Sequence, residues 1–280
     1  MIINKKPLGC KSYGSIPHIS FSKLGNNDHR IHEGQENILF KKTRNKYDNI
    51  VITEKLDGAN VAVTKIDGCL YPMTRAGNKC ELSTFQTHKD FNKYVFMNYN
   101  KFDSLLEEKE QISGEWLSIA HGLLYDLRGV DPFVVFDLFT PLKGTSRERY
   151  LFSETLGRIK HKFNHVPILY SGSNAVNIGA IHIMLGINGH YNAIEQAEGF
   201  VAKCENLKLG KCEFMAKYVK PNVQQGKYIK NDNGEQLEIH NFGYKTNDFK
   251  KYVEEYRIKF SSVGMDIEKM LNDYKTRINR

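Results

Sequence analysis

Apolar residues recur along the chain in two patterns, and each pattern predicts a different kind of element. Runs that alternate or are rich in β-branched and aromatic side chains predict strands at residues 50–55, 60–66, 69–73, 111–116, 132–139, 197–203 and 212–220. Helical spacing predicts helices within residues 84–108, 150–162, 173–186 and 248–280. Asp67-Gly68 separates two of the strands and predicts a hairpin. Together these elements favour an α+β fold with an antiparallel core.

The two ends of the chain depart from this pattern. Residues 8–49 are rich in glycine, asparagine, serine and histidine, which predicts loops with short strands. Gly226, Gly234 and neighbouring asparagines interrupt the pattern after the last predicted strand. We therefore predict a main domain at residues 1–225 and a small, largely helical region at residues 226–280.

The composition is typical of a soluble globular protein and excludes disordered and collagen-like chains. Of 280 residues, 40% are apolar and 26% are charged. The net charge is +8, and the positive excess lies in residues 1–50 and 201–280. Such a charge suits a polyanion such as nucleic acid, although many basic proteins bind none.

The cysteines and the absence of a membrane signal favour a cytoplasmic protein. The five cysteines include no CxxC pair, so a disulfide framework or a structural zinc site is disfavoured. No stretch approaches the roughly 20 apolar residues of a membrane helix. The first residues lack the apolar region of a secretion signal.

Candidate chemistry begins at Lys55-Leu-Asp57-Gly58, where a lysine ends a predicted strand and a glycine permits a sharp turn. A strand holds such an amine in place while leaving it exposed to a pocket, as a nucleophile requires. Taken alone, a surface lysine before a turn is the ordinary interpretation. Further charged strand segments follow in order: Thr74-Arg75-Ala-Gly77, Ser113-Gly-Glu115-Trp116, Phe136-Asp137, Glu198-Gly-Phe-Val-Ala-Lys203 and Ala216-Lys217-Tyr-Val-Lys220. Converging acids and lysines suit a metal-complexed polyphosphate better than an apolar core.

The order of these segments resembles the covalent nucleotidyltransferase superfamily of ATP-dependent ligases and capping enzymes, and within it the RNA ligase 2-like branch. Glu54-Lys55-x-Asp-Gly-x-Asn60 is similar to motif I, and Ser113-Gly-Glu115 is similar to motif III. The later motifs IIIa, IV and V are similar to Phe133-Val-Val-Phe-Asp137, Glu198-Gly-x-Val-x-Lys203 and Phe214-Met-Ala-Lys217. The resemblance covers about residues 50–220. It implies an antiparallel-sheet, ATP-grasp-like adenylation domain with a small helical C-terminal appendage and no OB-fold.

The resemblance also implies an RNA ligase that uses ATP as AMP donor and Mg²⁺ or Mn²⁺. Lys55 would become lysyl-AMP, and Lys203 and Lys217 would act with it as catalytic lysines at the α-phosphate. Glu198 would hold the metal, and Asn60 would contact RNA. The nucleotide-binding residues would be Thr53, Glu54, Asp57, Gly58, Arg75, Glu115, Phe136, Lys203, Lys217 and Lys220. The partner would be RNA with 3′-hydroxyl and 5′-phosphate ends. The protein is expected to be a monomer.

Several alternatives stay open at this stage. Phe136 lies in an apolar run and fits a core position as well as a base platform, and Arg75 fits a surface position after a hairpin. Motif V usually contains K-x-K, but Met215 takes the first place, so either Lys220 or Lys203 would substitute.

Other functions that share the resemblance are a catalytically limited RNA-binding protein with the ligase fold, a DNA ligase relative and a guanylyltransferase relative. Sixty residues follow Lys220 and their latter half is predicted helical, which disfavours an OB-fold and so favours RNA over DNA. Upstream, Tyr13-Gly-Ser-Ile-Pro-His18 and Asp28-His29 resemble the leading segment of RNA ligase-like proteins, but their chemistry is left unassigned.

Overall fold

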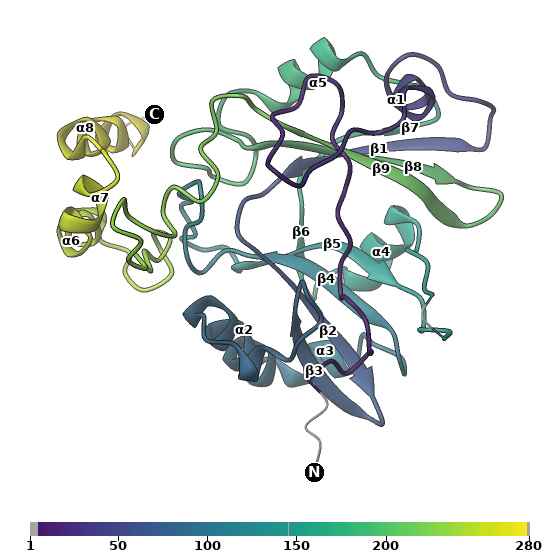
Figure 1. Cartoon of the computed structure of the whole chain (residues 1–280), viewed down its shortest axis with the longest axis horizontal. Helices are drawn as coiled ribbons and strands as arrows, with labels where there is room; N and C mark the ends of the chain where they lie inside the picture. Colours follow the sequence, from purple (N-terminus) through teal and green to yellow (C-terminus); the bar gives the residue numbers. More distant parts are fainter. Residues whose placement is uncertain (1–4, 145, 279–280) are drawn as a thin grey trace.

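The computed structural model describes residues 5–144 and 146–278, and its strands form two sheets that lie one above the other (Figure 1). The first sheet has the order β7-β1-β8-β9, with bounds Ile168–Gly172, Asp48–Lys55, Gly199–Asn206 and Lys211–Val219. The second sheet has the order β3-β2-β4-β5-β6, with bounds Cys69–Thr74, Ala59–Ile66, Gln111–Trp116, Phe133–Phe139 and Asn164–His165. The predicted α+β class is confirmed.

The strand pairs are antiparallel, as predicted, with one exception. Asp67 and Gly68 form the predicted hairpin turn between β2 and β3, and both have positive φ, 50° and 72°. The exception is the pair β5–β6, which is parallel. A helix, α4 (Phe152–Ile159), connects these two strands, and such a crossover is what a parallel pair requires.

Helices cover the outer faces of both sheets (Figure 1). Helix α2 (Gln86–Met97) packs on β2 and β3, α1 (Glu33–Phe40) on β8, and α5 (Ile178–Leu185) on β7. Two short elements, η1 (Cys80–Leu82) and α3 (Tyr99–Asp103), flank α2. The helix α1 corrects the prediction of loops with short strands at residues 8–49, because its apolar residues are confined to its last turn. The sequence also missed β6 and β7, which have only two and five residues and so carry too few periods of an apolar pattern. In the part of the chain that is described, none of the helices has the length and apolar character needed to cross a membrane.

The N-terminal segment, defined here as residues 12–31, runs from the second sheet to the first (Figure 1). The N–H of Tyr13 donates to the carbonyl of Arg75 at 3.3 Å, next to the end of β3. Farther along, the N–H of Ile19 donates to the carbonyl of Lys217 at 3.0 Å. The N–H of Lys217 donates to the carbonyl of Pro17 at 2.9 Å. The segment therefore ties β9 to the opposite sheet.

The C-terminal helices lie to one side of the sheets (Figure 1) and confirm the predicted helical tail. They are α6 (Phe249–Glu255), α7 (Arg257–Ser261) and α8 (Ile267–Ile278). Their apolar core includes Ala120 and Leu124, which belong to the loop between β4 and β5. Of the residues described after Val219, none forms a strand of a named sheet, so no OB barrel lies among them. The division at residue 225 stays a prediction.

Candidate active site

A cavity of about 770 Å³ lies between the two sheets. The first sheet contributes residues of β1, β8 and β9, and the second contributes residues of β2, β3, β4 and β5. The N-terminal segment adds Tyr13, Gly14 and Ile16 to the wall. A concave site lined by both sheets and by several charged side chains is the form expected of a ligand pocket.

Strand alternation brings three lysines from separate motifs to this cavity. In the antiparallel register Val51 pairs with Lys203, and Val201 pairs with Lys217. Side chains directly opposite each other share a face of the sheet, and Lys55 lies two pleats beyond Val51 on that same face. Lys55, Lys203 and Lys217 accordingly all line the cavity.

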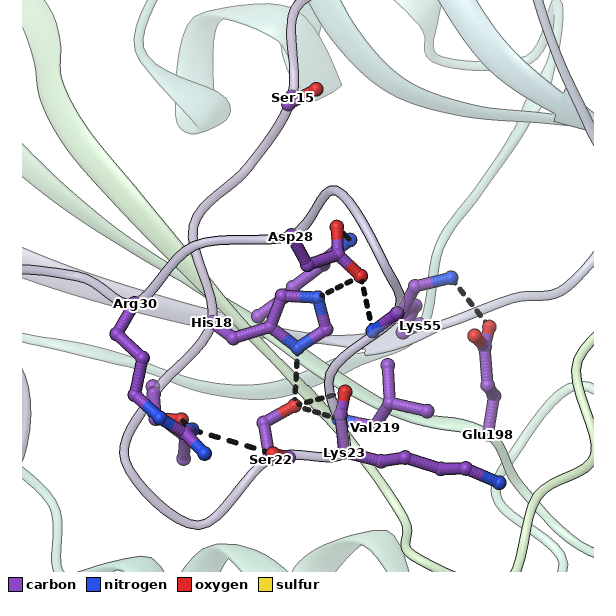
Figure 2. A network of polar contacts seen from close by, with 12 residues as sticks. Ser15, His18, Ser22, Lys23, Asp28, Arg30, Lys55, Glu198 and Val219 are labelled. Carbon is purple, nitrogen blue, oxygen red and sulfur yellow. Dashed lines mark hydrogen bonds and ion pairs between the residues drawn. The ribbon is translucent and has the colours of Figure 1, made fainter.

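The Lys55 ammonium is held by carboxylates. Its Nζ lies 2.5 Å from Oε2 of Glu198, and a dashed line marks this ion pair in Figure 2. Burial disfavours the charged amine, but the carboxylates of Glu198, Glu115 and Asp57 outweigh it and raise the pKa of Lys55. Burial acts to raise the pKa of Glu198, and Lys55 acts to lower it. Without a ligand, Lys55 therefore keeps its proton.

The turn after Lys55 is fixed from two sides. The N–H of Gly58 donates to Oε1 of Glu115 at 2.9 Å, and the N–H of Gly122 donates to Oδ2 of Asp57 at 2.6 Å. A Cβ at Gly58 would lie only 2.6 Å from the carbonyl oxygen of Trp116, so the close approach requires glycine. Burial raises the pKa of Glu115 to about 7, against the effect of Lys55.

Lys203 is engaged by a buried acid. Its Nζ lies 2.7 Å from Oδ1 of Asp137 and donates to the carbonyl of Phe136 at 2.7 Å. Oδ2 of Asp137 accepts from the Tyr13 hydroxyl at 2.5 Å and from Nε of Arg149 at 3.1 Å. Burial acts to raise the pKa of Asp137, but the two cations outweigh it and lower that pKa.

The remaining predicted residues at the cavity are Thr53, Arg75, Phe136 and Asn60. Nη2 of Arg75 donates to the Ser15 hydroxyl at 3.2 Å and to the carbonyl of Gly14 at 3.3 Å. Oδ1 of Asn60 is buried and has no hydrogen-bond partner among the described residues. An unpaired buried acceptor facing a cavity is a place where a ligand donor would be favoured.

Two predicted residues direct their charges elsewhere. Glu54 is among the residues that line the cavity, but its carboxylate accepts the N–H of His190 at 2.6 Å, and burial raises its pKa to about 7. Nζ of Lys220 contacts the carbonyl oxygens of Ile187 and Gly186 at 3.1 and 3.3 Å, and Lys220 is not among the residues that line the cavity.

The register clarifies the unusual motif V. Met215 lines the cavity directly opposite Lys203 in the β8–β9 pair. Of the two lysines that the sequence left open as substitutes, Lys203 is therefore the one that stands at the cavity with Lys217.

Some residues at the site were not assigned a role from the sequence. Tyr13 contacts Asp137, and Asp28 lies against Lys217, both from the N-terminal segment. His121 lines the cavity, and burial lowers its pKa. The only signal for the first two was the resemblance of the leading segment, which gave no contact.

A second group of potential metal ligands lies away from the cavity. Asp48, Cys204 and Glu213 bring three such atoms within 4.8 Å of one another. The guanidinium of Arg44 bonds to Asp48 at 2.7 Å and also to Glu213, and the acids outweigh burial in raising the pKa of Arg44. This group is thus already neutralised by a side chain of the protein.

Among the comparisons with known proteins, the match to a family model covers the strands that form the cavity. The family model described as RNA ligase matches residues 48–219. An uncharacterized protein of Methanocaldococcus jannaschii is 38% identical over 55 residues, which is 20% of this chain and 14% of that protein.

Solved structures of Naegleria gruberi RNA ligase are also similar. The form with PPi is 19% identical with a TM-score of 0.48, covering 75% of this chain and 59% of that chain. A mutant with AMP and Mn is 17% identical with a TM-score of 0.47, covering 77% and 62%. The chain thus spans less than two thirds of the length of these proteins.

Proposed function

The chain belongs to the RNA ligase family, and from this premise we propose that it is an ATP-dependent RNA ligase with a lysyl-AMP intermediate. Nζ of Lys55 attacks the α-phosphorus of ATP, a P–N bond forms, and pyrophosphate leaves. The AMP then passes to the 5′-phosphate of an RNA end. A 3′-hydroxyl attacks that activated phosphate, and AMP leaves as the strands are joined.

The observation that carries this proposal is the position of Lys55 beside two other lysines in one cavity. Lys203 and Lys217 supply positive charge where the α-phosphate would carry its negative charge, and a preorganised cation needs no reorganisation during transfer. Lys217 enters from β9 and Lys203 from β8, so the sheet fixes the distance of both from the nucleophile. Positioning and charge are the main contributions expected for phosphoryl and nucleotidyl transfer.

The acids around Lys55 are side chains of the type that binds a divalent cation. Glu198, Glu115 and Asp57 offer carboxylate oxygens, the donors that Mg²⁺ and Mn²⁺ prefer, in contact or electrostatic range of Lys55. We propose that Glu198 holds the ion. When bound, the cation supplies positive charge beside Lys55, which favours the neutral amine needed for attack.

We propose that the adenosine lies against the wall of the cavity that the second sheet forms. Phe136 faces the cavity and makes an edge contact with the Tyr13 ring at 5.1 Å, so one ring face can stack on a base. We propose that Glu115 and Arg75 contact the ribose or phosphates, and that Thr53, Asp57 and Gly58 bound the nucleotide. Asn60, with its unpaired oxygen, is proposed to contact RNA.

Labelling with ATP tests this proposal. Incubation with α-labelled ATP and Mg²⁺ or Mn²⁺ is expected to give a covalent protein–AMP adduct that survives denaturation and mild alkali. Warm acid should release the AMP, because protonation of the nitrogen makes a P–N bond easy to hydrolyse. Lys55→Ala should abolish the label. Lys65→Ala is the matched control, because Lys65 lies on β2 and pairs with Asp103 at 2.8 Å. A label that persists in Lys55→Ala would refute the assigned nucleophile.

The same preparation separates the alternatives. A pre-adenylated RNA strand should be sealed without ATP, whereas a catalytically limited RNA-binding protein would bind RNA and seal no ends. An adduct formed with GTP in preference to ATP would indicate a guanylyltransferase relative. Efficient sealing of DNA but not RNA would indicate a DNA ligase relative. A cytoplasmic location, a monomeric state and a role in RNA repair stay predictions.

A further inference from the structure

The N-terminal segment lies outside the family match and holds buried polar groups that the proposed chemistry does not use. Its central residue is His18, which is completely buried. Nδ1 of His18 lies 2.6 Å from the Ser22 hydroxyl, and Nε2 lies 2.9 Å from Oδ2 of Asp28 (Figure 2). The Ser22 oxygen also accepts the N–H of Val219, at the end of β9, at 2.9 Å.

These contacts favour one protonation state of His18. Because Ser22 accepts from Val219, its own hydroxyl proton is free to point at Nδ1 of His18. The ring proton then lies on Nε2, the nitrogen that is 2.9 Å from Oδ2 of Asp28. Burial and the nearby Lys217 lower the pKa of His18, so the ring is neutral at physiological pH. His18 is therefore a fixed support for the Asp28 carboxylate.

From this support, Asp28 is directed at Lys217. Its Oδ2 accepts the N–H of Gly25 at 3.0 Å, and its Oδ1 lies 3.4 Å from Nζ of Lys217. Burial would raise the pKa of Asp28, but the Gly25 N–H, Lys217 and His18 outweigh it and lower that pKa. The carboxylate is thus charged, held on two sides and paired with Lys217.

Lys217 experiences opposing influences. Burial and the positive charge of Lys55 lower its pKa, whereas Asp28 and Glu198 act against that shift. Several charged or titratable groups surround Lys217 and its immediate partners. They are Lys55 from β1, Glu198 from the residue before β8, and Asp28, His18 and Arg30 from the N-terminal segment. Among these, Asp28 is an acid that contacts Lys217 directly.

We propose that Asp28, fixed by His18, is a positioning residue that holds Lys217 as a cation beside Lys55. Lys217 can then meet the α-phosphate as a preformed charge, although burial and repulsion from the Lys55 ammonium favour its neutral form. The proposal rests on the adenylation reaction proposed above and assigns part of that site to a segment upstream of the family match. Ser22 itself is not a nucleophile here, because it is buried and its oxygen is engaged by Val219.

The kinetic test is single-turnover adenylation by Asp28→Asn from neutral to alkaline pH. We expect the adenylation rate to be about tenfold lower at neutral to mildly alkaline pH. The alkaline limb of the pH–rate profile should also move about one pH unit lower, because Lys217 loses the negative charge of Asp28 that keeps it protonated. Combining Asp28→Asn with Lys217→Arg should remove that movement, because a guanidinium does not lose its proton. A purely structural role would lower the rate without moving the limb.

The matched control is Glu36→Gln. Glu36 anchors the same segment through the Ser20 N–H at 3.0 Å and the Ser20 hydroxyl at 2.6 Å. Removal of the Glu36 charge should leave the adenylation rate and its pH profile near those of the wild type. If Glu36→Gln and Asp28→Asn have equal effects, the segment is merely an anchor and the proposal is wrong.

A second measurement does not depend on ATP. Competitive labelling with an amine-reactive reagent, read by mass spectrometry, should show Lys217 reacting several-fold faster in Asp28→Asn at mildly alkaline pH. Unchanged labelling would overturn the proposal even if the wild type forms the adduct. Absence of any wild-type adduct would overturn the proposed function instead. If Asp28→Asn does not fold, His18→Gln, which leaves the carboxylate but removes its support, should move labelling in the same direction.

Discussion

At the scale of single residues, Asp137 joins three parts of the chain that are distant in sequence. It binds Lys203 of β8 at 2.7 Å, Tyr13 of the N-terminal segment at 2.5 Å, and Arg149 at 3.1 Å. Asp137 is 2% exposed, so these partners replace the water that a carboxylate would otherwise bind. The residue thereby fixes a cavity lysine and the entry of the N-terminal segment together.

We expect Asp137→Ala to destabilise the fold by about 3–5 kcal/mol, because it leaves Lys203 buried without its counter-charge. Urea unfolding measures this. The folded-state pKa of Asp137 is lowered, so its contribution is present above the unfolded value near 3.8 and is lost as the pH falls through the folded value. The stability of the variant should therefore fall less steeply at acidic pH.

Glu148→Ala is the control for this prediction, because Glu148 forms an exposed pair with Lys211. Little change is expected there. Equal unfolding midpoints for Asp137→Ala and the wild type would contradict the role assigned to Asp137.

At the scale of elements, the pleat of β1, β8 and β9 separates two environments. One face carries the three cavity lysines, and the other carries Ile50, Phe200 and Ala216, which pack beneath α1 and α5. Sequence periodicity predicted these strands within a few residues. It could not predict that the carboxylate of Glu54 accepts the N–H of His190, because the layer that covers each face of the sheet is decided by the tertiary structure.

Gly199 is the element-scale test. A Cβ there would lie 1.9 Å from the carbonyl oxygen of Tyr218, so Gly199→Ala must push β8 and β9 apart. We expect a loss of about 1–3 kcal/mol in the free energy of unfolding and slower adenylation, because Glu198 precedes this position. Gly157→Ala in α4, where a Cβ meets nothing within 4 Å, should instead be neutral or stabilising. Equal stability of the two variants would show that the β8–β9 contact is not limiting.

At the scale of the whole molecule, the C-terminal helices share a core with the loop after β4. Phe260 and Tyr252 pack in a cluster that includes Ala120 and Leu124. Backbone bonds reinforce the contact, since the N–H of Leu127 donates to the carbonyl of Phe242 at 2.7 Å. A shared core favours unfolding of both parts together.

Phe260→Ala tests this coupling. Phe260 is fully buried, so its truncation should lower the free energy of unfolding by about 3–5 kcal/mol, within one cooperative transition. Calorimetry would detect it. Ile258→Ala in the same helix is the control, because Ile258 is 84% exposed and should matter little. Two separate transitions, with only one shifted, would indicate that residues 226–280 unfold independently.

The sequence by itself determined the strands that carry charge, the order of the motifs and the resemblance to RNA ligases. These features are local, since a period of two and a short motif are complete within a few residues. Only the tertiary structure decided that Lys203 and not Lys220 lines the cavity with Lys217. It also decided that Tyr13 lines this cavity and that Asp28 contacts Lys217. Asp28 and Lys217 are 189 residues apart in sequence. Their contact depends on strand register and on the path of the N-terminal segment across two sheets, which no local pattern encodes.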